Sequence, residues 1–167
     1  SNGIHSNGLS LARRALFEIA GYDATTHLEE LGCSVGEELL QPTYIYVAEA
    51  LDILSRIDDV GALIHITGDG FLNLTRVKAD VSFVIDDLPP VPPLFALIER
   101  ITGAAAMEMY HVFNMGIGFC LVVRPEAEAE VVEIIRGHGK ACQRIGYVSD
   151  GPAGHVKIEP AGIEMTR

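Results

Sequence analysis

Apolar residues recur every three or four positions in several segments of the chain, the spacing that places side chains on one face of a helix. In residues 44–56, positions 44, 47, 48, 51, 54 and 55 form one stripe, apolar except at Ser55, which predicts a helix that packs this stripe against a sheet. Residues 9–20 carry a similar stripe, and Gly21 is expected to end that helix. Further predicted helices cover residues 94–101, 104–112 and 126–136.

Shorter apolar runs predict the strands. Residues 60–66 and 119–123 are nearly continuous apolar runs of the kind found in buried strands. Residues 79–85 alternate, so that Val81, Phe83 and Ile85 share one face. Residues 141–149 and 155–159 also alternate, and the turn-rich link between them predicts a hairpin at the end of the chain.

These elements predict an α+β fold, in which a mixed β-sheet is flanked by α-helices as an α/β sandwich. Residues 22–41 are polar and are expected to form a loop with short helical turns. The proline-rich residues 86–93 predict a stiff surface crossover, because proline lacks a backbone donor and fixes φ. The length of 167 residues suits one domain, residues 1–167, with a sizeable core.

Composition narrows the classes of function. The formal net charge of −11 argues against a protein that binds nucleic acid through its phosphates. Three widely spaced cysteines fit neither a disulfide framework nor a zinc site, which indicates a reducing compartment. No apolar run approaches the roughly 20 residues that span a bilayer. We therefore expect a cytoplasmic protein that contacts neither nucleic acid nor a membrane.

Three glycine-containing loops, at residues 1–8, 65–73 and 113–118, carry the candidate chemistry. Glycine lets backbone N–H groups approach an anion, and Asn, Ser, Thr or His side chains beside it donate further hydrogen bonds. The first loop is either such a binding loop or only a helix N-cap through Ser6 or Asn7. Asp69 fits an anion site poorly, unless its carboxylate turns outward or is countered by Arg76 or a metal.

Two other groups leave alternatives open. His65, on an apolar strand, is either a buried histidine bonded to a backbone carbonyl or a ligand-binding residue, whereas His5, in a polar loop, is the better functional candidate. The pair Asp86 and Asp87, beside prolines, is either a Mg²⁺ ligand pair or a solvated turn. No residue is assigned as a metal ligand.

Four blocks of sequence together resemble the C-terminal domain of the phosphoribosylformylglycinamidine cyclo-ligase family, also called aminoimidazole ribonucleotide synthetases. The blocks are Ser1–Arg14, Leu40–Tyr46, Ala62–Gly70 with Asn73 and Arg76, and Phe113–Gly118. The resemblance implies ATP-dependent closure of an imidazole ring on formylglycinamidine ribonucleotide, a step of purine biosynthesis. It also implies that ATP and Mg²⁺ are held largely by an N-terminal domain that builds a dimer. That domain is absent from this chain, which is therefore expected to be inactive alone.

The resemblance implies roles for particular residues. His5 is expected to be catalytic through orientation of the substrate. The phosphate-bearing substrate is expected to meet Ser6, Asn7, Gly8, His65, Thr67, Gly68, Gly70, Asn73, Arg76, Asn114 and Gly116. The family usually has Thr-Gly-Gly-Gly and Asn-Ile-Pro-Arg where this chain has Thr67-Gly-Asp-Gly70 and Asn73-Leu-Thr-Arg76. This departure leaves open a divergent paralogue, or a noncatalytic binding or assembly domain.

Overall fold

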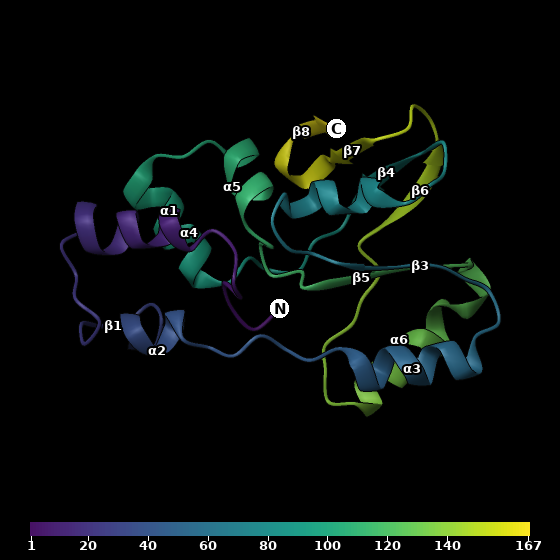
Figure 1. Ribbon diagram of the computed structural model, residues 1–167, viewed down its shortest axis with the longest axis horizontal. Coiled ribbons are helices and arrows are strands. Elements are labelled where there is room, and N and C mark those ends of the chain that lie inside the picture. Colours follow the sequence, from purple (N-terminus) through teal and green to yellow (C-terminus); the bar gives the residue numbers. More distant parts are fainter.

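The computed structural model describes all residues from Ser1 to Arg167. Helices occupy one end of the molecule, a four-stranded sheet lies toward the other end, and a two-stranded ribbon runs between that sheet and a pair of helices (Figure 1). Helices and a sheet with both parallel and antiparallel pairs confirm the predicted α+β class. No helix has the length and apolar character needed to cross a membrane.

The chain enters its first helix through Gly8. Helix α1 (Leu9–Arg13) continues as the π-helical turn η1 (Arg14–Ile19), as the apolar stripe predicted. The N-cap residue is Gly8, at φ 71°, and no side chain caps the helix, so the alternative of a cap by Ser6 or Asn7 is wrong. A Cβ at Gly8 would collide with the Phe113 ring, so this position needs glycine for both space and conformation.

The polar segment that follows is more ordered than predicted. Strands β1 (His27–Leu28) and β2 (Cys33–Ser34) form a small antiparallel hairpin, and α2 (Val35–Leu39) follows directly. A capping box begins α2, because the Ser34 hydroxyl accepts from the Glu37 N–H while the Glu37 carboxylate accepts from the Ser34 N–H.

Strands β3 (Val60–His65) and β5 (Phe119–Val123) form an antiparallel ribbon with an irregularity between Val60 and Ala62. The ribbon separates two cores. On one side Ile64, Ile66 and Cys120 belong to a main core of 23 buried residues. On the other, Val60, Leu121 and Val123 pack on a small core between α3 (Val47–Arg56) and α6 (Glu128–Gly137), the latter preceded by the turn η3 (Pro125–Ala127).

The face that α3 buries differs from the prediction. Ile53 and the following Ile57 are buried against α6, whereas Val47, Leu51 and Leu54 of the predicted stripe are exposed. The helix is also shorter at its start than the predicted 44–56. Apolar spacing alone therefore indicated a helix correctly but named the wrong inner face, because this helix is apolar on two sides.

The larger sheet has the order β6–β4–β7–β8, from β4 (Val81–Ile85), β6 (Gly146–Asp150), β7 (His155–Ile158) and β8 (Ile163–Thr166). The predicted terminal hairpin is wrong, because β4 lies between β6 and β7, antiparallel to the first and parallel to the second. The link crosses the start of β4, where the Ser82 hydroxyl donates to the Pro152 carbonyl at 2.9 Å. Strand β8 follows the turn η4 (Glu159–Ala161) and was not predicted.

Helices α4 (Pro93–Thr102) and α5 (Ala106–Val112) complete the main core, close to their predicted bounds. Gly103 ends α4 in the left-handed conformation. The turn η2 (Gly70–Arg76) connects the end of β3 to β4 and packs against α5 and the large sheet. This arrangement places the loop after β3 between the ribbon, α5 and η2.

Candidate functional site

The three glycine-containing loops lie together in the structure. Asn114 joins the first to the third: its Nδ2 donates to the Gly3 carbonyl at 2.9 Å, and its Oδ1 accepts from the Ser1 hydroxyl and the Gly116 N–H. The Ser1 ammonium also donates to the Gly116 carbonyl. Asn114 is 2% exposed, so its side chain is part of the scaffold that holds the two loops.

The loop after β3 joins the same group. The Ile66 N–H donates to the Gly118 carbonyl at 3.0 Å, which continues the ribbon ladder into the third loop. Asn7 of the first loop lies beside Gly68. Gly70, at φ 52°, lies against the backbone of α5 so closely that a Cβ would collide with the Tyr110 carbonyl. Sequence motifs at least 40 positions apart thus form one region around the end of β3.

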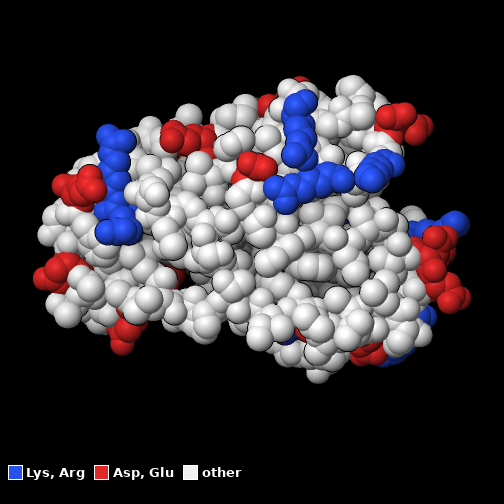
Figure 2. All heavy atoms as spheres, in the orientation of Figure 1, with Lys and Arg blue, Asp and Glu red and all other residues white.

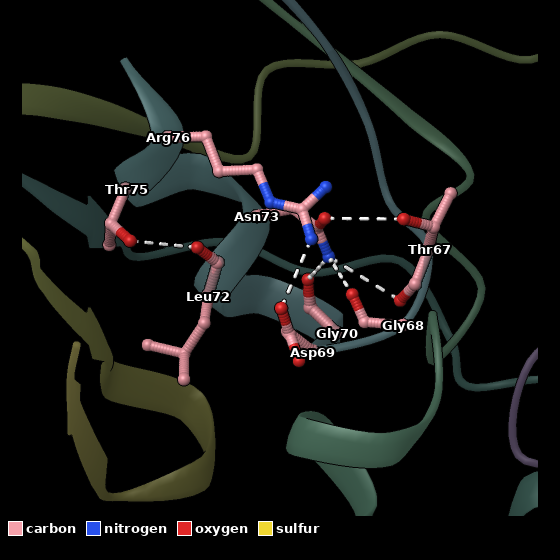
Figure 3. A network of polar contacts seen from close by, with 8 residues as sticks. All are labelled: Thr67, Gly68, Asp69, Gly70, Leu72, Asn73, Thr75 and Arg76. Carbon is pink, nitrogen blue, oxygen red and sulfur yellow. Dashed lines mark hydrogen bonds and ion pairs between the residues drawn. The ribbon is translucent and has the colours of Figure 1, made fainter. Parts of the chain in front are cut away.

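Asn73 organises the loop from within (Figure 3). Its side chain is fully buried, and its Nδ2 donates to the carbonyls of Gly68 (2.9 Å) and Gly70, with a longer contact to Thr67. Its Oδ1 accepts from the Thr67 hydroxyl at 3.2 Å. A ligand bound by the Asn73 side chain would compete with these bonds, so its evident part is to shape the loop.

Asp69 and Arg76 form an ion pair at the surface of this loop, with Nη2 and Oδ2 3.0 Å apart (Figure 3). Each side chain is about half exposed. Asp69 has φ 75°, a left-handed conformation that glycine adopts without strain and that Asp tolerates at some cost. The counter-charge that the sequence named as one way to accommodate Asp69 is therefore present.

A pocket of about 350 Å³ lies beside the outer edge of β3. Strand β3 pairs only with β5, so its other edge lines this pocket from Ala62 to His65. The opposite wall comes from η2 and its flanks. Lys and Arg side chains gather over the upper right part of the face drawn in Figure 2. The residues that line the pocket are Ala62, Leu63, Ile64, His65, Thr67, Asn73, Arg76 and Val77.

His65 links this pocket to a cluster of rings. Its side chain is exposed, so the alternative of a buried histidine is wrong. Its ring centroid lies 5.5 Å from that of Tyr46, 6.1 Å from that of Phe119 and 6.4 Å from that of His5. A Cβ at Gly118 would collide with the Tyr46 hydroxyl and crowd His5, so glycine there leaves the space that both rings occupy.

His5 is buried, and only one of its two ring nitrogens has a hydrogen-bond partner. It is 6% exposed and has φ 58°; its Nε2 lies 3.1 Å from the Asn2 Oδ1, while its Nδ1 has no partner. Burial, with the nearby N-terminal ammonium and His65, lowers the pKa of His5 to about 4. The ring is therefore neutral near pH 7 and can exchange hydrogen bonds, but it does not supply a positive charge.

Tyr46 is the residue of this cluster that sequence reasoning did not single out. Its hydroxyl is buried without a hydrogen-bond partner, and burial raises its pKa to about 12. The only signal was its place at the end of the block Leu40–Tyr46 that carried the family resemblance. An unpartnered buried hydroxyl costs free energy, which makes Tyr46 a candidate for contact with a polar ligand atom.

The remaining predicted residues lie near the site but differ in exposure. Ser6 is exposed, Asn7 and Gly8 are half-buried, and Gly116, at φ 97°, packs against Pro92. The Asp86 carboxylate is held by the Arg144 guanidinium through two hydrogen bonds of 3.1 and 2.7 Å, so it does not stand free for a cation. No group of three or more His, Cys, Asp or Glu side chains gathers anywhere in the structure with the arrangement of a metal site.

Comparison with known proteins places this site in a family. The sequence profile described as "AIR synthase related protein, C-terminal domain" matches residues 1–159. A phosphoribosylformylglycinamidine cyclo-ligase of Methanococcus maripaludis strain C7 is 44% identical over 166 residues, 98% of this chain and 47% of that protein. The same-named protein of Methanobrevibacter smithii is 43% identical, over 99% of this chain and 48% of that protein.

A third relative with that name, from Methanocaldococcus jannaschii, is 44% identical over 90% of this chain and 43% of its own length. The chain thus spans about half the length of the curated relatives that it matches. The family profile covers nearly the whole chain, including every loop of the site. The chain therefore belongs to the family of AIR synthase related protein C-terminal domains.

Proposed function

We propose that this chain is the C-terminal half of an ATP-dependent cyclo-ligase, which converts formylglycinamidine ribonucleotide to aminoimidazole ribonucleotide in purine biosynthesis. Its part is to hold the phosphate-bearing ribonucleotide in the pocket beside β3. The observation that carries the proposal is the position of Arg76 and Thr67 together on the wall of that pocket, next to an unpaired strand edge. The names of the relatives, which match over nearly the whole chain, support the reaction.

The chemistry of the pocket suits a phosphate. Arg76 has five N–H donors, and its ion pair with Asp69 engages one terminal nitrogen. The others remain for an anion, and Arg–phosphate pairs are among the strongest charge-assisted hydrogen bonds. The Gly68 backbone is exposed at the same loop, where glycine permits a close approach to a ligand.

The ring cluster suits the reacting end of the substrate. His65 is exposed at the pocket, whereas His5 behind it is neutral near pH 7 and has an unpartnered Nδ1. In the proposed reaction His5 orients the substrate through a hydrogen bond and does not donate a full charge. Such a role contributes through positioning, which governs phosphoryl transfer and ring closure alike.

We assign ATP and Mg²⁺ largely to the part of the relatives that lies outside the region matched by this chain. When bound, ATP would supply the phosphoryl group that activates the formyl oxygen, and Mg²⁺ would neutralise the charge of its phosphates. The residues of this chain do not fit a Mg²⁺ site: Asp69 is paired with Arg76, Asp86 is held by Arg144, and no cluster of ligands gathers. We therefore expect no turnover by the chain alone.

The pocket is tested by calorimetric titration of the chain with ribose 5-phosphate, and separately with inorganic phosphate. We expect weak, saturable binding that Arg76→Gln weakens at least fivefold. The matched control is Arg100→Gln, since Arg100 is also an exposed arginine paired with one carboxylate, that of Glu30. Equal affinity of wild type and Arg76→Gln would refute the pocket assignment.

A second candidate function, a noncatalytic binding domain of the same family, is favoured by Asp69. Its carboxylate occupies a left-handed position in the loop and engages the arginine that a phosphate would use. Joining the unmatched half of the Methanococcus maripaludis relative to this chain separates the two. ATP-dependent product formation that is lost in His5→Asn supports the enzyme, whereas ligand binding without turnover supports the binding domain.

A further inference from the structure

Exposed apolar side chains are concentrated in one short stretch of the chain. Six of the eleven large apolar residues that are exposed fall within residues 40–54. Leu40 is 83% and Ile45 77% exposed, values far above those of ordinary partly covered surface residues. We call this surface the 40–54 face; its members are Leu40, Tyr44, Ile45, Val47, Leu51 and Leu54.

Helix α3 already has a partner on its other side. Ile53 and Ile57 are buried in the small core against α6. Val47, Leu51 and Leu54 are spaced by four and three residues, so they form a second stripe that points away from that core. A helix that is apolar on two faces is typical of one packed between two partners, and here only one of them is present.

The 40–54 face carries little charge. No Lys, Arg, Asp or Glu occurs from Leu39 to Ala48. In Figure 2 the surface over the segment between α2 and α3 is predominantly uncharged, in contrast to the charged margins of the molecule. The complementary surface is therefore apolar, as in obligate interfaces between subunits, which are more hydrophobic than transient ones and depleted of charge at their centre.

The face is continuous with the candidate site. Tyr46 lies in the same segment, between the exposed Ile45 and Val47, and its ring stacks on Phe119 at 5.1 Å and meets His65 edge-on. Its buried hydroxyl has no partner. A partner seated on the 40–54 face would thus also border the ring cluster at the pocket.

We propose that the 40–54 face is the docking surface for the other half of the protein, the N-terminal domain by which the relatives exceed this chain. About half of each relative lies outside the matched region, and in those proteins that half is joined covalently to the counterpart of this chain. A second copy of this chain fits less well, because two chains of net charge −11 repel each other. The inference rests on the length of the relatives and on this surface, and it is independent of the proposed reaction.

The test measures protection of single introduced cysteines against maleimide. Leu51→Cys is compared in the chain alone and in a fusion that carries the unmatched half of the Methanococcus maripaludis relative before Ser1. The matched control is Ile19→Cys: Ile19 is 51% exposed against 61% for Leu51, but it ends η1, which continues α1 at the opposite end of the molecule from α3 (Figure 1). Peptide mapping separates these sites from Cys33, Cys120 and Cys142.

We expect labelling at position 51 to slow at least tenfold in the fusion, while position 19 reacts equally fast in both proteins. Equal labelling of position 51 in both would overturn the proposal. Protection of position 51 in the chain alone that grows with protein concentration would also overturn it, in favour of a second copy. Leu51→Asp provides a further check: it is expected to leave the urea midpoint of the isolated chain unchanged and to destabilise the fusion.

Discussion

The loop after β3 and the segment before α3 lie on either side of His65, yet they are built in opposite ways. In the loop, buried Asn73 satisfies the surrounding carbonyls, and Phe71 and Leu74 are buried in the main core. In the segment, apolar side chains are exposed, while the Tyr46 hydroxyl is buried without a partner. The first region is complete within this chain, whereas the second has the features of a surface that a further domain covers.

The largest effect is expected from breaking the complete region. Asn73→Ala removes the donor to the partly buried Gly68 and buried Gly70 carbonyls and the acceptor for Thr67, which should lower the free energy of unfolding by about 4 kcal/mol. Urea unfolding measures this loss. Thr75→Ala is the control, since it removes a single hydrogen bond to the Leu72 carbonyl and should cost about 1 kcal/mol. Similar losses for both variants would contradict the role given to Asn73.

The second-largest effect is expected from acid, which should lower the free energy of unfolding through protonation of His5. Its pKa is lowered to about 4 in the folded chain, so the unfolded chain binds a proton first as the pH falls. The contribution of neutral His5 is complete above about pH 6.5 and is lost between about 6.5 and 4, in total about 3 kcal/mol.

His5→Asn provides the comparison for that pH dependence, because Asn tolerates the left-handed backbone at this position. Between pH 7.5 and pH 4, the unfolding free energy of the wild type should fall by about 3 kcal/mol more than that of His5→Asn. Parallel curves across this range would show that His5 is not titrating as described.

Removal of one partner of the ion pair between Glu49, in α3, and Lys140 should reveal the cost of an unpaired buried charge. Glu49 is 5% exposed, and the Lys140 Nζ lies 2.6 Å from its Oε1. Burial raises the pKa of Glu49, but the Lys140 ammonium outweighs this and leaves that pKa lowered. Lys140→Met should cost about 2 kcal/mol at neutral pH, less than a fully enclosed pair because Lys140 is partly exposed.

Adding Glu49→Gln to Lys140→Met should restore part of that loss, since it removes the stranded charge. Thermal unfolding of the single and double variants measures the recovery. A double variant less stable than Lys140→Met would mean that Glu49 is stabilised by other groups.

The smallest effect is expected at Asp69. Asp69→Gly relieves the left-handed backbone at φ 75° and should stabilise the chain by about 1 kcal/mol, less the small value of an exposed ion pair. It also frees Arg76, so phosphate should bind severalfold more tightly. Asp69→Asn separates the causes, because it removes the charge but keeps the side chain. If neither variant binds phosphate more tightly than the wild type, Asp69 and phosphate do not compete for Arg76.

Local signals in the sequence predicted much of the fold. The prolines before α4 and Gly103 after it define that helix, and the apolar run of β5 matches the strand residue for residue. The pairing of strands that lie far apart in the sequence could not be predicted from such local signals. A short turn-rich link looks like a hairpin, and nothing local reveals that β4 inserts between β6 and β7.

The candidate site was predictable only as a set of loops. The glycine-containing segments named its parts, because close approach and positive φ require glycine at Gly8, Gly70 and Gly116. Which polar residues contact a ligand and which bond to the backbone depends on their burial, and burial cannot be read from the sequence. Asn73 and Asn114 were expected at a ligand, yet both are buried and bonded to the backbone. Tyr46 gave no local signal of its own.

The position of β4 has a kinetic consequence. Its residues 81–85 pair with residues 146–150 on one side and 155–158 on the other. The central strand β4 is therefore synthesised more than 60 residues before the strands that pair with it. Such long-range pairing slows folding, because loop closure precedes any gain from contact. During synthesis, Phe83 and Ile85 therefore stay without strand partners until residues 146–158 have also left the ribosome.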